Sequence, residues 1–99
     1  MARLDDILAI LRAHQDELKA RGVLHAGVFG SVARGEETED SDVDVALDLD
    51  PGRSIGLFAY SGIRIYLADV LGREVDIVSR PCRRPDFAAE VERDYRNAF

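Results

Sequence analysis

The first part of the chain repeats apolar residues at three- and four-residue intervals, as an amphipathic helix does. We predict this helix over residues 3–21, with Gly22 as its stop. Its apolar face consists of Leu4, Ile7, Leu8, Leu11 and Leu18. Acidic residues fall in the first turn and basic residues in the last, which the helix dipole favours. We therefore expect a helix that packs against a core.

Three later segments have the pattern of strands. Residues 23–29 are apolar and partly β-branched, which is typical of a buried strand. Residues 42–49 and 74–79 alternate acidic or polar residues with aliphatic ones, which predicts strands with two different faces. Between the first two strands, residues 31–35 predict a turn or a single helical turn, and Pro51-Gly52 ends the second strand.

Two more helices are expected. Ser54 is a candidate N-cap for a helix that continues to Gly72, although residues 63–67 also alternate and leave a strand as a minor alternative. The apolar positions of this helix are Ala59, Ile63, Tyr66, Leu67, Val70 and Leu71. Near the end of the chain, a spacing of four predicts a final helix that carries Phe87, Val91, Tyr95 and Phe99.

The order of these elements is α-β-α-β-α-β-α, which predicts a single α/β (α+β) domain over residues 1–99. We expect a small mixed sheet of three or slightly more strands, flanked by helices. The strands at 42–49 and 74–79 are joined by a helical crossover, so we expect them to be parallel neighbours.

Composition narrows the protein class. The 99 residues are 46% hydrophobic and 32% charged, which is typical of a soluble globular domain. No apolar run approaches the roughly 20 residues of a membrane span, and the first ten residues lack the pattern of a signal peptide. Cys82 is the only cysteine, which excludes an internal disulfide and favours a reducing, cytoplasmic location. His14 and His25 complete no zinc motif.

The net charge of −6 is concentrated in one segment. Residues 36–50 hold eight acids and no base, which leaves the rest of the chain with a net charge of +2. A general nucleic-acid binder shows a basic stripe instead, so we expect no direct nucleic-acid partner. Crowded carboxylates repel one another unless a cation neutralises them, and a divalent ion is the obvious candidate.

Three aspartates are the candidate site in this sequence. Asp42 and Asp44 are two residues apart on one predicted strand, so their side chains share a face. Asp76 lies between aliphatic residues of the next strand, and pairing of the two strands would bring three carboxylates together. Such a group resists joint ionisation unless it holds Mg²⁺, which takes oxygen ligands and substrate phosphates. Two such ions, about 3.5–4 Å apart, serve phosphoryl and nucleotidyl transfer.

The acidic segment has other interpretations. Solvated charge is the plainer interpretation, and we adopt it for residues 36–40 and for Asp48 and Asp50 near the end of the strand. A calcium-binding EF-hand fails because Val45 stands where glycine is required, and Pro51 where glutamate is required. A Walker A loop fails because Glu36 replaces the necessary lysine.

Gly30-Ser31 adds a second element to the site. It follows a predicted strand and opens a turn, where exposed backbone N–H groups suit a phosphate and glycine allows close approach. The Ser31 hydroxyl can donate to a phosphate oxygen, and Arg34 is one turn further on. Each feature taken alone is more often an ordinary turn or a surface charge.

Together these residues form the pattern G-S-x10-D-x-D, with the flanks F-G-S-V-A-R-G and S-D-V-D-V. The pattern resembles the nucleotidyltransferase superfamily that includes DNA polymerase β. That fold also carries a third carboxylate on a later strand, for which Asp76 is the candidate. The resemblance covers about residues 1–80.

The absence of an additional acceptor-binding domain makes the chain similar to minimal nucleotidyltransferases, and in particular to the MntA antitoxins that pair with HEPN-domain toxins. The resemblance implies an enzyme that transfers AMP from ATP to a tyrosine hydroxyl of a partner HEPN ribonuclease toxin and so silences it.

The same resemblance implies which residues act. The nucleotide-binding residues would be Gly30, Ser31 and Arg34. The catalytic metal ligands, for two Mg²⁺ ions, would be Asp42, Asp44 and Asp76. Two alternatives stay open: an antitoxin that binds and occludes its toxin without catalysis, and transfer to a small hydroxylated molecule. Arg80, Arg83, Arg84 and Cys82 are left without a role.

Overall fold

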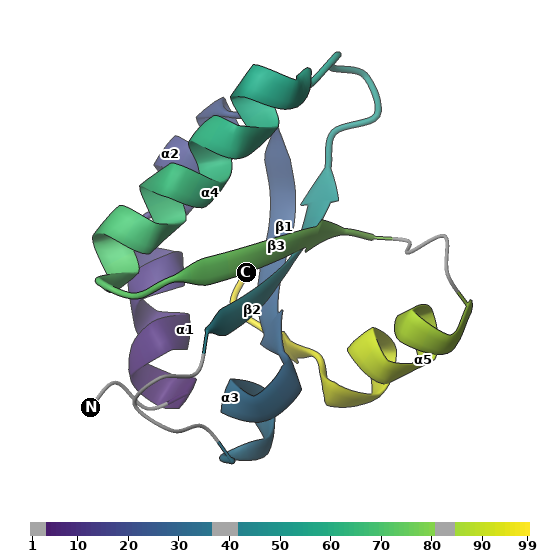
Figure 1. Ribbon diagram of the computed structural model, residues 1–99. Helices are drawn as coiled ribbons and strands as arrows, with labels where there is room; N and C mark the ends of the chain where they lie inside the picture. The colour runs from purple at the N-terminus through teal and green to yellow at the C-terminus, as the bar shows by residue number, and fades with distance from the viewer. Residues whose placement is uncertain (1–3, 37–41, 81–84) are drawn as a thin grey trace.

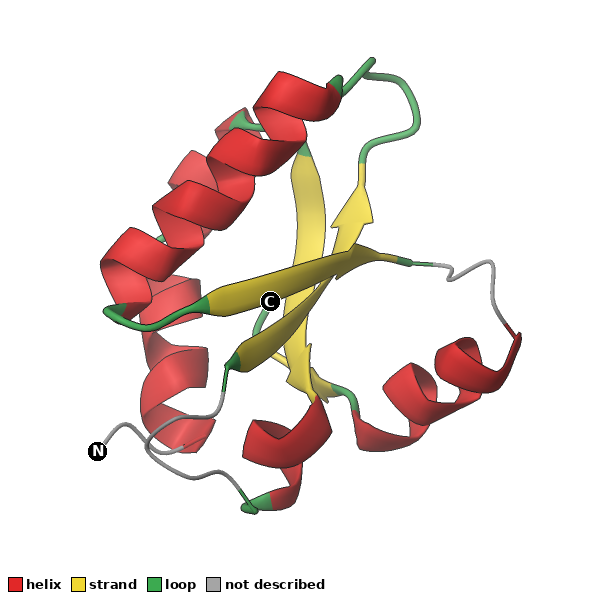
Figure 2. Ribbon diagram, viewed as in Figure 1, coloured by secondary structure: helices red, strands yellow, loops and turns green. Residues whose placement is uncertain are grey.

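The computed structural model describes residues 4–36, 42–80 and 85–99, which form a four-stranded sheet with helices on both faces (Figures 1 and 2). The elements in chain order are α1 (Leu4–Ala13), α2 (Gln15–Ala20), β1 (Val23–Phe29), α3 (Gly30–Arg34), β2 (Val43–Leu49), α4 (Leu57–Leu71), β3 (Val75–Ser79), α5 (Pro85–Asp94) and β4 (Arg96–Asn97). The predicted α/β class is confirmed.

The sheet has the strand order β3-β2-β1-β4 and is mixed. β1 is antiparallel to β2 and to β4, whereas β2 and β3 are parallel. The parallel pair is joined through α4, so the predicted helical crossover is confirmed. β4 is the strand that the sequence pattern did not predict.

The two faces of the sheet are covered unequally. α1, α2 and α4 lie over one face (Figure 1) and supply most helical members of the larger core cluster. That cluster includes Ile7, Leu11, Leu18, Ile63 and Leu67 from the helices and Val43, Val45 and Leu47 from β2. The opposite face holds a smaller cluster of Phe29, Ala46 and Val91, the last from α5. The thinly covered face is the one toward which the even-numbered residues of β2 point.

The single helix predicted over residues 3–21 is in fact two helices. α1 ends at Ala13 and α2 begins at Gln15, because His14 leaves helical geometry with φ −107° and ψ 15°. The His14 ring Nδ1 donates to the Ile10 carbonyl oxygen at 2.9 Å, which gives that carbonyl a side-chain donor at the break. The predicted apolar stripe survives the break, since Ile7, Leu11 and Leu18 are all fully buried.

The predicted final helix was wrong in its second half. α5 ends at Asp94, and Tyr95 and Phe99 lie outside it. The chain instead returns to the sheet, where β4 pairs with β1 and the Ala98 N–H donates to the Ala26 carbonyl at 2.8 Å. This pairing satisfies backbone groups that would otherwise be left at the edge of β1.

The start of α4 also differs from the prediction. Gly56 is the N-cap of α4, no side chain caps it, and Ser54 lies two residues before it. Cys82, Arg83 and Arg84, and the acids at 37–40, lie outside the described residues. Within the described residues, no helix is long and apolar enough to cross a membrane.

Candidate active site

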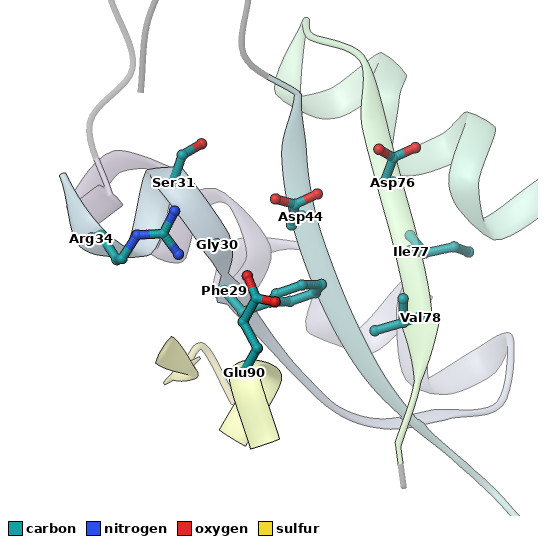
Figure 3. Close-up of a pocket in the computed structure, with 9 residues that line it drawn as sticks. All are labelled: Phe29, Gly30, Ser31, Arg34, Asp44, Asp76, Ile77, Val78 and Glu90. Atoms are coloured by element: carbon teal, nitrogen blue, oxygen red, sulfur yellow. The ribbon is translucent and has the colours of Figure 1, made fainter. Parts of the chain in front are cut away.

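The parallel pairing of β2 and β3 aligns two acids. Asp44 and Asp76 are direct partners in the register of this strand pair, and Figure 3 shows their carboxylates side by side. Neighbouring strands lie about 4.8 Å apart, so the two carboxylates are within the range where like charges interact strongly.

Both acids line a cavity of about 560 Å³, which has the size of a small-molecule site (Figure 3). Its lining residues are Phe29, Gly30, Ser31, Arg34, Asp44, Asp76, Ile77, Val78 and Glu90. Five of the six residues that the sequence singled out therefore share one cavity. The polar part of the cavity is built from β2, β3, α3 and α5, and Phe29 and Val78 supply apolar side chains beside it. Ile77 borders the cavity from β3, but its side chain points to the other face of the sheet and packs against the larger core.

Gly30 is required where β1 passes into α3. It is buried and has φ +75°, a left-handed conformation that glycine adopts without strain. A Cβ atom added to Gly30 would collide with the Asp44 carboxylate. The absence of a side chain therefore lets the first turn of α3 approach Asp44, and it puts Ser31 at the edge of the same cavity.

The environment of Asp44 disfavours its charged form. The pKa of Asp44 is raised from 3.8 to about 6, mainly by burial and in addition by the negative charges of Asp76, Asp42 and Glu90. Arg34 acts in the opposite direction but does not offset them. No ion pair within the described part of the chain involves Asp44. A carboxylate in this state is suited to receive a cation.

Asp48 lies four residues further along the same face of β2 and has the opposite environment. Its two oxygens accept hydrogen bonds from Arg80, from Nε at 2.7 Å and from Nη2 at 2.8 Å. The Arg80 guanidinium also lies 3.8 Å from the ring centroid of Tyr95. The expectation that Asp48 is solvated was wrong, because a basic residue after β3 neutralises it.

Asp42 does not join Asp44 and Asp76 in the cavity. It is exposed, immediately before β2, and acts on the site through the effect of its charge on the pKa of Asp44. Among the residues described, no group of three or more acidic, histidine or cysteine side chains is arranged to hold a metal. Two adjacent carboxylates nevertheless fit Mg²⁺, which is usually held in proteins by one or two carboxylates together with waters and phosphates.

Arg34 lies in the cavity wall but already has partners. Its Nη1 donates to Asp94 Oδ2 at 2.6 Å, and its Nε donates to Glu36 Oε2 at 3.0 Å. Hydrogen bonds with these two acids raise the pKa of Arg34 above its ordinary value, so it stays a cation.

Sequence reasoning missed Glu90, which comes from α5 and lines the cavity opposite β3 (Figure 3). A usable signal was present in the sequence. Glu90 lies four residues before Asp94, so both acids fall on the same face of the predicted helix.

A family model for the nucleotidyltransferase domain matches residues 11–98, almost the whole chain. The chain belongs to this family. The nucleotidyltransferase is 41% identical to the protein adenylyltransferase MntA of Thermococcus cleftensis over 95 residues, which cover 95% of this chain and 94% of the relative. The resemblance to minimal nucleotidyltransferases of the MntA type, and the enzyme class that it implied, are confirmed.

Solved structures agree with this assignment. A structure described as a minimal nucleotidyltransferase superposes with a TM-score of 0.77 at 34% identity, covering 96% of this chain and 95% of the other. The nucleotidyltransferase also shares its fold with a chain from a second structure, that of a tri-AMPylated Shewanella oneidensis HEPN toxin in complex with an MNT antitoxin. The TM-score is 0.65 at 16% identity. That match covers 93% of this chain and 71% of the other.

Proposed function

We propose that this nucleotidyltransferase is an antitoxin that transfers AMP from ATP to a tyrosine hydroxyl of a HEPN-domain ribonuclease toxin. The observation that carries the proposal is the Asp44–Asp76 pair, in register on two parallel strands and facing Gly30-Ser31 across one cavity. The choice of donor and acceptor is supported by the relatives, one named a protein adenylyltransferase and one a complex of an MNT antitoxin with an AMPylated toxin.

Each part of the cavity has a proposed task. The backbone of Gly30, the hydroxyl of Ser31 and the guanidinium of Arg34 hold the β- and γ-phosphates. Asp44 and Asp76 are the proposed ligands of Mg²⁺, and Asp42 is an additional candidate. The metal would offset the charge of the carboxylates and the phosphates.

The transfer is an in-line displacement at the α-phosphorus. The tyrosine oxygen forms a bond to this phosphorus, the bond from phosphorus to the bridging oxygen of the β-phosphate breaks, and pyrophosphate leaves. Asp76 is exposed at the edge of the cavity and is the proposed acceptor of the phenolic proton. Catalysis then rests mainly on positioning and charge neutralisation.

The test is label transfer from ATP labelled at the α-phosphate, with Mg²⁺, the purified chain and its HEPN partner. Label should appear on the toxin with the native chain and with Asp48→Asn, which removes a charge from the same strand but outside the cavity. It should be absent with Asp42→Asn/Asp44→Asn.

Two results would overturn the proposal. A stable, inactive toxin complex without label would favour inhibition by occlusion. Label that moves only to added small hydroxylated molecules would favour a small-molecule acceptor.

A further inference from the structure

The last residue of α5, Asp94, stands in an unfavourable place for an acid. It is the single charged side chain that is buried in the described part of the chain, with 6% of its surface exposed. It also ends a helix, where the negative end of the helix dipole opposes a carboxylate. Burial and position thus both act against this charge, so its partners must compensate.

The compensation comes mainly from Arg34. Asp94 Oδ2 accepts from Arg34 Nη1 at 2.6 Å, and Asp94 Oδ1 accepts from the exposed Arg93 Nε at 3.3 Å. Burial acts to raise the pKa of Asp94, but the hydrogen bonds from Arg34 and Arg93 outweigh it and leave this pKa below its ordinary value. Asp94 is therefore a permanent anion around neutral pH, fixed against Arg34.

This ion pair joins two elements that are far apart in the sequence. Arg34 belongs to α3 and Asp94 to the end of α5, and these short helices enclose the cavity beside the sheet. In Figure 3 the Arg34 side chain extends from α3 toward the cavity. Arginine has many rotamers, and a buried partner that holds Nη1 removes most of that freedom before a ligand arrives.

We infer that Asp94 is a positioning residue, which holds the Arg34 guanidinium in the cavity wall so that it can contact the phosphates of the nucleotide. The inference rests on the proposed function, because it takes a nucleoside triphosphate as the ligand of this cavity. Glu36, the second partner of Arg34, accepts from Nε at 3.0 Å but is 64% exposed, so water competes for it more than for the buried Asp94.

If Asp94 had the opposite role, removing its charge would change nucleotide affinity in the opposite direction. If Asp94 instead withheld Arg34 from the nucleotide, removing its charge would release the guanidinium and strengthen binding. A positioning role requires that the same change weaken binding. The two roles are therefore separated by the direction of one measured effect.

The experiment is calorimetric titration of the purified chain with a non-hydrolysable ATP analogue and Mg²⁺. Asp94→Asn should weaken binding by about tenfold, the scale of one hydrogen bond to a charged group. Asp48→Asn is the matched control, since it also removes one acid and one arginine pair on this face of the sheet. It should bind with near-native affinity.

A double-mutant cycle separates positioning from a general structural defect. Arg34→Gln should weaken binding at least as much as Asp94→Asn, and adding Asp94→Asn to Arg34→Gln should then change affinity by less than about twofold. Full additivity, unchanged affinity of Asp94→Asn or tighter binding would each overturn the inference.

Asp94→Glu is the second variant in case Asp94→Asn does not fold. It keeps the charge but displaces the guanidinium, and it should also bind more weakly; native affinity would count against positioning. The proposed function fails separately, in the native chain, if that chain binds no nucleotide.

Discussion

Replacing Asp44 by asparagine should make the metal-free protein more stable. The side chain keeps its shape but loses a charge that burial and three nearby acids disfavour. A rise of the pKa from 3.8 to about 6 corresponds to about 3 kcal/mol, at roughly 1.4 kcal/mol per pKa unit. Because the carboxylate is only half-buried, water screens part of this cost. We expect a gain of about 1–2 kcal/mol in the free energy of unfolding at pH 7.5.

The sign of the pH dependence follows from the direction of the shift. Between pH 3.8 and about 6 the folded state binds more protons at Asp44 than the unfolded state, so the stability of the native protein falls as the pH rises. The Asp44→Asn variant does not lose stability in this way, because asparagine does not titrate. The difference between variant and native protein should therefore be largest above pH 6 and should shrink toward zero near pH 3.8.

The assay is urea unfolding followed by circular dichroism, in EDTA, at pH 7.5, 6.0 and 4.5. Asp48→Asn is the control with the opposite expected sign. It breaks a bidentate pair with Arg80 and should lose about 1–2 kcal/mol at pH 7.5. A destabilised Asp44→Asn at pH 7.5, or a gain that persists unchanged at pH 4.5, would refute the reasoning and make Asp44 a structural residue.

Four further outcomes are expected. The Gly30→Ala variant should be less stable by at least about 1 kcal/mol in urea unfolding and should not transfer AMP, because position 30 has a positive φ and an added Cβ would collide with Asp44. A stable, active variant would contradict the role of Gly30. Gly27→Ala should cost about 2–3 kcal/mol in the same assay, since a Cβ there would collide with the Tyr95 ring, and native stability would show that β4 and Tyr95 move freely. Mg²⁺ at about 100 times its dissociation constant should stabilise the native protein by about 2.7 kcal/mol in thermal unfolding but should not stabilise Asp44→Asn, and equal shifts would place the metal elsewhere. Glu90→Gln should lower the pKa of Asp44 in a carboxyl NMR titration, and an unchanged pKa would exclude their coupling.

Local patterns predicted most of the fold. The alternation over 42–49 and 74–79 sets which side chains share a face, and a helical crossover makes two strands parallel. These two facts suffice to expect Asp44 and Asp76 on one side of neighbouring strands. The register that makes them direct partners could not be read from the sequence, because it depends on how α4 packs.

The wrong prediction at the end of the chain has its physical origin in contacts between distant segments. A spacing of four from Phe87 to Phe99 fits a helix, yet the chain leaves helical geometry after Asp94 to satisfy the edge of β1. This return needs Gly27, because any side chain there would collide with the Tyr95 ring. The requirement links residues 68 positions apart and leaves no trace in local periodicity.

The comparison of Asp44 with Asp48 shows what distinguishes a candidate catalytic acid from a structural one. Alternation places both on the same face of β2, and their sequence contexts are nearly identical. The fold gives Asp48 a bidentate arginine from the end of β3, whereas Asp44 receives another carboxylate, Asp76, at the corresponding position. Because Arg80 neutralises Asp48 while the pKa of Asp44 is raised, only Asp44 needs a cation from outside the chain. The candidate metal ligand is thus defined by the residue on the adjacent strand.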